Sequence, residues 1–296
     1  MTAGFTRGVA AVLAAVTLAA GGCAYLDVKQ REWIFRPQRE VQATPADLGL
    51  RFDEVWLAVP GAGGERERVN GWWIPAADAG APALLYLHGA RWSLSNNLRR
   101  IGQLHRMGFA VLAIDYRGFG RSDGALPSEA QAYADAQAAW EHLRGRERDP
   151  ARRFLYGHSL GGAVAIELAT RNDDVAGVIV ESSFTSIRDM VDALGYTSLS
   201  LDGLITQRFD SLAKVPAVSA PILFVHGTAD RFVPPAMTER LYAAARDPKR
   251  LLLIANGTHR NSTDVGYEKY LSAVRELVEL ARRISPTRTA TPGRSG

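Results

Sequence analysis

Cysteine is scarce in this chain of 296 residues. Cys23 is the single one, so an internal disulfide and a cysteine-based metal site are both excluded. The chain also has no large excess of either charge, because 35 basic and 31 acidic residues leave a formal net charge of +4. No basic run interleaved with aromatic residues is present, and such a run is typical of proteins that bind single-stranded nucleic acid. We therefore expect no nucleic-acid partner.

The chain also lacks a long apolar run, and the apolar run near its start is shorter than a membrane-spanning helix requires. Arg7 precedes the apolar run Val9–Ala20, and Gly21, Gly22 and Cys23 follow. A charged start, an apolar stretch and small residues before a cleavage site are typical of a secretory signal, and the run is too short to span a bilayer comfortably.

The segment ending in Cys23 resembles a bacterial lipoprotein signal, in which the cysteine is lipid-modified and becomes the first mature residue. The resemblance implies a signal peptide over 1–22 and a lipid-anchored tether over 23–48. Ala24 follows the cysteine where an aspartate would indicate retention in the inner membrane, so we expect the periplasmic face of the outer membrane. The alternative is a plain signal cut nearby and secretion to the periplasm.

The rest of the chain divides into one domain and a tail. Residues 49–285 are expected to form the domain, with a lid insertion at about 187–220. Residues 286–296 lack large apolar side chains and are expected to be disordered. In the tether, three apolar residues could dock on the domain: Trp33, Ile34 and Phe35.

Short apolar runs alternate with amphipathic stretches through the domain. This alternation predicts an α/β fold with a mostly parallel central sheet, about eight strands and helices on both faces. The first two strands, Val55–Val59 and Val69–Ile74, are joined by a glycine-rich turn and should be antiparallel. The parallel strands expected are Ala83–Leu87, Ala110–Ile114, Arg153–Tyr156, Val175–Val180, Ile222–Val225 and Arg250–Ile254. The helices expected are Ser95–Met107, Ser128–Leu143, Leu160–Arg171, Ala236–Ala245 and Asp264–Arg283.

A nucleophile motif lies between one of these strands and the next helix. Gly157-His158-Ser159-Leu160-Gly161 is a Gly-x-Ser-x-Gly sequence in the context of strand, sharp turn and helix. A side chain at either glycine would collide with the neighbouring strand or helix. The pattern predicts that Ser159 is a catalytic nucleophile at a helix N-terminus.

A nucleophilic serine needs a base and a carboxylate that orients the base. Asp230 follows the strand Ile222–Val225, and His259 follows the next strand. The order Ser, Asp, His is the order found in this kind of fold, and we assign the three roles accordingly. Glu181 and Asp210 remain alternative acids.

An oxyanion requires two preorganised N–H groups. Leu160 should supply one, and Ala90, in the loop after the strand Ala83–Leu87, the other, with Arg91 as second choice. His88 comes too early in the chain to be the base and is expected to brace this loop. No cofactor or metal is expected, because Asp115, His226 and His259 end different strands and form no recognisable ligand set.

From about residue 50 to 283 these motifs resemble the α/β-hydrolase superfamily. Four segments resemble its compact branch of eukaryotic protein depalmitoylases and their bacterial relatives, namely His88-Gly89, the run from Asp115 to Ser122, the run from Glu181 to Ser186, and the run from Arg208 to Ser211. The resemblance implies a serine hydrolase that cleaves esters or thioesters through an acyl-enzyme. We expect the protein to be a monomer. The chain departs from the branch at Ala90, where asparagine is usual, and at Arg260, where asparagine or aspartate is usual.

Two other functions stay open. One is a serine aminopeptidase or amidase, and the other is a non-catalytic, membrane-tethered binding protein. Apolar lid residues could line an acyl groove or form a local core: Leu194, Tyr196, Leu199, Leu201, Leu204 and Ile205.

Overall fold

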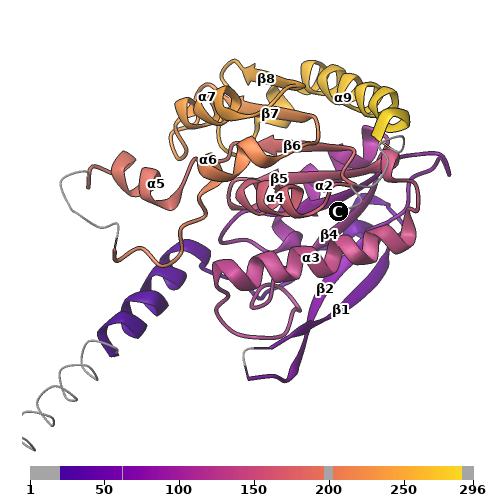
Figure 1. The fold of residues 1–296 in the computed structure, drawn as a ribbon. Coiled ribbons are helices and arrows are strands. Elements are labelled where there is room, and N and C mark those ends of the chain that lie inside the picture. Colours follow the sequence, from indigo (N-terminus) through magenta and orange to yellow (C-terminus); the bar gives the residue numbers. More distant parts are fainter. Residues whose placement is uncertain (1–20, 62, 197–202, 289–296) are drawn as a thin grey trace, which may run out of the picture.

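A central sheet of eight strands runs through the molecule. The computed structural model describes residues 21–61, 63–196 and 203–288 (Figure 1). The strands are β1 (Asp53–Pro60), β2 (Arg66–Ile74), β3 (Ala83–Leu87), β4 (Ala110–Ile114), β5 (Arg153–His158), β6 (Gly177–Glu181), β7 (Ile222–Gly227) and β8 (Lys249–Ile254). Their order is β1-β2-β4-β3-β5-β6-β7-β8, antiparallel from β1 to β4 and parallel from β4 onward. The predicted fold class is confirmed.

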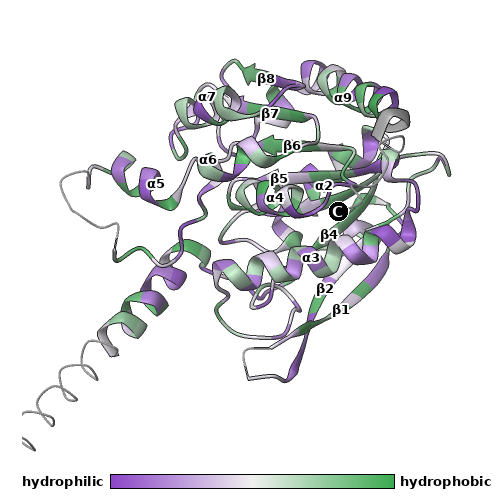
Figure 2. Ribbon diagram, viewed as in Figure 1, coloured by the Kyte–Doolittle hydropathy of each residue, from purple (hydrophilic) through white to green (hydrophobic). Residues whose placement is uncertain are grey.

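Helices cover both faces of this sheet, and each face has its own apolar core. On one face lie α2 (Leu98–Arg106) and α9 (Tyr267–Arg288), and on the other lie α3 (Glu129–Arg146), α4 (Leu160–Arg171) and α7 (Pro235–Ala244). Green apolar strands alternate with purple polar helix faces in Figure 2. The short elements are η1 (Pro45–Leu48), η2 (Leu94–Asn97), η3 (Pro150–Arg152), α5 (Ile187–Ala193), α6 (Ser211–Lys214), η4 (Val215–Ala217) and α8 (Ser262–Val265).

The predicted elements match the observed ones except at a few ends. β2 begins at Arg66 because its antiparallel pairing with β1 continues out to Pro60, beyond the apolar part of the strand. β8 was expected to be covered on both faces, but only Ile254 of this strand is buried, because β8 is the edge strand. The helix expected over Ser95–Met107 is divided into η2 and α2, and the helix expected over Asp264–Arg283 is divided into α8 and α9, which continues to Arg288.

The segment before the sheet packs onto the domain. Residues 21–35 are helical, and Phe35 is fully buried with its ring 5.9 Å from that of Phe209. Trp33, by contrast, is 69 % exposed. The backbone then follows the loop after β3, where the Ser95 hydroxyl accepts hydrogen bonds from the N–H groups of Gln42 and Ala43. Within the residues described, no helix combines the length and apolar character needed to cross a membrane.

We expect Phe35→Ala to lower the free energy of unfolding by about 3–5 kcal/mol, the usual cost of removing a buried aromatic ring. Trp33→Ala is the matched control, and its exposed ring predicts a change within about 0.5 kcal/mol. Denaturant unfolding of the two variants and the wild type provides the comparison. Equal losses in both variants would contradict the packing described for Phe35.

A buried carboxyl group lies at the end of β4. Asp115 is 1 % exposed, and its Oδ1 accepts a hydrogen bond from the Leu94 N–H and lies 3.4 Å from Nε2 of His88. Burial raises the pKa of Asp115 to about 8, although the Leu94 hydrogen bond opposes this rise. Burial likewise lowers the pKa of His88 to about 4. Both groups are therefore largely uncharged at neutral pH.

This raised pKa predicts a specific pH dependence of stability. Folded Asp115 keeps its proton up to about pH 8, whereas the unfolded chain loses it near the ordinary value. The folded state thus binds more protons between these values, and stability falls by up to about 1.4 kcal/mol per pH unit as pH rises. Asp115→Asn removes this contribution. Subtracting the unfolding free energy of the variant from that of the wild type should give a value that decreases from about pH 5 to about pH 8. A constant difference would rule out the raised pKa.

Candidate active site

Ser159 occupies a strained turn between β5 and α4. Its backbone angles, φ of 55° and ψ of −119°, lie in a region that residues other than glycine rarely adopt. A Cβ at Gly157 would overlap the carbonyl oxygen of Gly161, and one at Gly161 would overlap the carbonyl oxygen of Leu87. The steric reason predicted for the two glycines is therefore confirmed. The Ser159 N–H donates to the Glu181 carbonyl at 2.9 Å, which helps to hold the turn.

Asp230 and His259 come together at the ends of β7 and β8. Nδ1 of His259 lies 2.8 Å from Oδ2 of Asp230, and Asp230 Oδ1 accepts the N–H groups of Phe232 and Val233 at 2.8 and 2.9 Å. His226, which sequence reasoning considered only as a metal ligand, places Nε2 3.1 Å from the same Oδ2. Burial alone would raise the pKa of Asp230, but the hydrogen bonds from His226 and His259 outweigh it and hold this pKa well below its usual range. Asp230 is thus a charged acceptor that orients the imidazole of His259.

The two alternative acids have other partners. Glu181 is fully buried and binds Arg100 at 3.1 Å and the Tyr156 hydroxyl at 2.6 Å. Asp210 caps α6 by accepting the Ala213 N–H at 3.0 Å. Neither of these carboxylates is the partner of His259.

Ser159 and His259 line one cavity of about 230 Å³, together with Ala90. Leu160 begins α4, and N–H groups in a first helical turn have no partner within the helix. Arg91 donates its N–H to the Phe35 carbonyl at 2.7 Å, so this group is engaged and is removed as the alternative oxyanion donor. The cavity can therefore present a hydroxyl, an imidazole and N–H groups to one carbonyl carbon.

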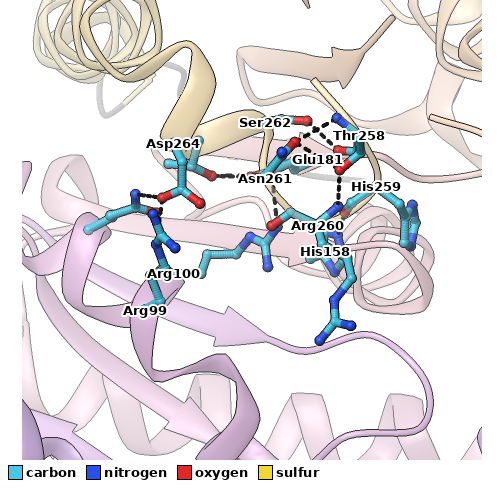
Figure 3. Close-up of polar contacts among 12 residues, drawn as sticks. Arg99, Arg100, His158, Glu181, Thr258, His259, Arg260, Asn261, Ser262 and Asp264 are labelled. Atoms are coloured by element: carbon cyan, nitrogen blue, oxygen red, sulfur yellow. Dashed lines mark hydrogen bonds and ion pairs between the residues drawn. The ribbon is translucent and has the colours of Figure 1, made fainter. Parts of the chain in front are cut away.

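The loop that carries His259 is held by groups that sequence reasoning missed (Figure 3). Nε2 of His158 lies 2.9 Å from the His259 carbonyl oxygen, and burial lowers the pKa of His158 well below its usual range, so the ring is a neutral donor. Arg100 donates to the Arg260 carbonyl at 3.3 Å while it pairs with Glu181. The sequence signal for this contact is Glu181, an acidic residue at the end of the buried strand β6, which needs a cation such as Arg100 as its partner.

His88 lies in the core, as its expected bracing role requires. It is fully buried against the rings of Tyr116 and Phe119, with centroids 4.6 and 4.9 Å away, and its Nδ1 is 2.6 Å from the Gly89 carbonyl oxygen. In the part of the chain that the structure describes, no three His, Cys, Asp or Glu side chains are grouped so that they could hold a metal ion.

The lid residues lie away from the cavity. Leu194, Tyr196 and Leu204 are 72, 54 and 50 % exposed, and Ile205 is half-buried. None of these four lines the cavity that contains Ser159. Leu199 and Leu201 fall outside the described residues.

Comparison with known proteins identifies relatives. Residues 81–209 match the family Hydrolase_4, described as serine aminopeptidase, S33. The uncharacterized protein Rv2307c of Mycobacterium tuberculosis is 34% identical over 271 residues, which are 90% of this chain and 94% of the relative. The alpha/beta hydrolase domain-containing protein WAV2 of Arabidopsis thaliana is 29% identical over 87% of this chain and 90% of its own.

A solved structure shares the fold. The esterase Pf2001 of Pyrococcus furiosus superposes with a TM-score of 0.67 at 21% identity, and the match covers 82% of this chain and 98% of the esterase. Its architecture supports the arrangement of strands and helices described above. Sequence relatives and architecture agree: the chain belongs to one family with Rv2307c, and it has the α/β-hydrolase fold.

Proposed function

We propose that this α/β-hydrolase cleaves carboxylic esters or thioesters through an acyl-enzyme on Ser159. One observation carries the proposal. Ser159 is held in a strained turn at a helix N-terminus, in a cavity that is also lined by His259, and the imidazole of His259 is bound by the buried carboxylate of Asp230. These are the nucleophile, the base and the orienting acid of serine acyl transfer.

The reaction follows from these positions. Nε2 of His259 accepts the hydroxyl proton as Ser159 Oγ bonds to the acyl carbon, and Asp230 stabilises the imidazolium. The N–H groups of Ala90 and Leu160 donate to the oxyanion. The imidazolium then protonates the leaving oxygen or sulfur, and the acyl group remains on Ser159. A water molecule, deprotonated by His259, attacks this ester and releases the acid and free Ser159.

An aminopeptidase is the second candidate, because the matching family model is described in that way. A free amino group is a cation and needs carboxylates to bind it. Among the described residues that line the cavity, the charged side chains are those of Arg91 and Arg260, with no carboxylate. This charge favours the esterase or thioesterase over the aminopeptidase. Retention of all three catalytic groups likewise favours an enzyme over a non-catalytic binding protein.

Reaction with a fluorophosphonate tests the nucleophile. We expect mass spectrometry to locate one adduct on Ser159, Ser159→Ala to lose it, and ester turnover to fall by about 10⁴-fold or more in that variant. Ser272→Ala, an exposed serine on α9, is the control and should keep both properties. A folded wild-type protein without an adduct would refute the mechanism. A chain-length series of p-nitrophenyl esters and acyl thioesters then separates the two substrate classes.

We also propose that the protein acts as a monomer anchored through a lipid on Cys23, at the periplasmic face of the outer membrane. The signal-like residues before Cys23 and the exposed position of this cysteine support the anchor.

Metabolic labelling with an alkyne fatty acid tests the anchor in cells. The wild type should carry the label on a mature chain that begins at Cys23, and Cys23→Ala should lose the label because acyl transfer needs the thiol. Ser272→Ala should remain labelled. An unlabelled wild type that is recovered in the soluble periplasmic fraction would instead support a plain secretory signal.

A further inference from the structure

Two arginine side chains line the catalytic cavity without a carboxylate partner. The guanidinium of Arg260 lies 3.7 Å from the ring centroid of Trp92, and that of Arg91 lies 5.6 Å from the ring centroid of Phe232. Both arginines are exposed, and neither forms an ion pair with a carboxylate of the described residues. The buried Arg117, in contrast, forms ion pairs with the carboxylates of Glu67 and Asp135. The two cavity arginines are therefore held by aromatic rings with their hydrogen-bond donors free for a ligand.

The position of these arginines relative to His259 indicates which part of a substrate they meet. Arg260 follows His259 directly in the chain. The Phe232 ring, which contacts Arg91, also lies 5.0 Å from the His259 ring. His259 must pass its proton to the leaving group, so the leaving group has to lie beside His259. Both arginines therefore line the same cavity as His259, in which the leaving group has to lie.

The fixed charge in this cavity is positive. Of the described residues that line it, none carries a carboxylate. Asp230 lies behind His259 and is saturated by hydrogen bonds. A guanidinium binds a carboxylate or a phosphate through two parallel N–H donors, which an uncharged alcohol cannot match.

We propose that the preferred substrates are acyl esters whose leaving alcohol carries a carboxylate or phosphate group, bound by Arg91 and Arg260. This inference rests on the proposed function and names its substrate class. It assigns the two arginines to specificity, with Trp92 and Phe232 as their supports.

A pair of esters of similar shape tests the preference. The probes are 4-carboxyphenyl butyrate and its neutral analogue 4-carbamoylphenyl butyrate, with each kcat/KM divided by the rate of alkaline hydrolysis of the same ester. At low ionic strength we expect the wild type to favour the anionic ester by about tenfold, a size typical of partly exposed charge-assisted hydrogen bonds. The ratio should fall as salt is added, because both guanidinium groups are exposed.

Variants assign the effect to the two arginines. Arg91→Gln and Arg260→Gln should each lower the ratio, and the double variant should bring it to about one. Arg260→Lys keeps the charge without the planar fork, and it should retain part of the preference. Arg246→Gln is the control, since Arg246 is exposed and does not line the cavity. A third ester, 4-phosphonophenyl butyrate, separates the two anions, because the larger preference identifies the group that fits the site.

The outcomes separate this inference from the function on which it rests. Turnover of both esters with a ratio near one in the wild type, or a preference that survives in the double variant, overturns the inference and leaves the esterase intact. A wild type that cleaves neither ester and is not labelled at Ser159 overturns both.

Discussion

The ion pair between Arg100 and Glu181 connects the parts of the candidate active site. Burial alone would raise the pKa of Glu181, but Arg100 and the hydroxyl groups of Tyr156 and Tyr270 outweigh it and keep this carboxyl charged. The Glu181 carbonyl holds the Ser159 N–H, and Arg100 holds the carbonyl of Arg260 in the loop of His259. Removing either charge would leave the other buried without a partner, which is far more costly than losing an exposed pair. The positions of Ser159 and His259 thus depend on one buried ion pair that neither residue makes through its own side chain.

Much of this architecture was predictable because the information is local. Continuous apolar runs fix the buried strands. Gly157 is required by a contact with Gly161, only four positions away, whereas Gly161 is required by the Leu87 carbonyl on a neighbouring strand and was predictable only as part of the Gly-x-Ser-x-Gly motif. The chain order of Ser159, Asp230 and His259 follows from the position of each at a strand end. The predicted pairing of His259 with Asp230 rather than Glu181 is visible only in the folded chain, where the hydrogen bond forms.

The features that escaped prediction depend on contacts between distant segments. Arg100 lies on a helix whose amphipathic pattern says nothing of a buried carboxylate on β6, 81 positions away. Phe35 was expected to dock on the domain, but the sequence did not predict that its ring enters the core beside Phe209. The engagement of the Arg91 N–H by the Phe35 carbonyl has no sequence signature, since any residue could supply a carbonyl oxygen. Such backbone contacts decide which N–H groups remain free to bind a ligand, and they cannot be predicted from the types of residue in the sequence.

The contact between Phe35 and Arg91 has a mechanical consequence. Chain tension applied near Cys23 would reach the domain first where Asp27 accepts hydrogen bonds from Thr206 and Gln207. It would act next where Arg31 donates to the Pro127 carbonyl, and then at the hydrogen bond between Phe35 and Arg91 in the loop beside Ser159. The first strand, β1, begins only at Asp53. Force on the N-terminal segment would therefore act on the segment around Thr206 and on the loop after β3 before it could disturb the sheet.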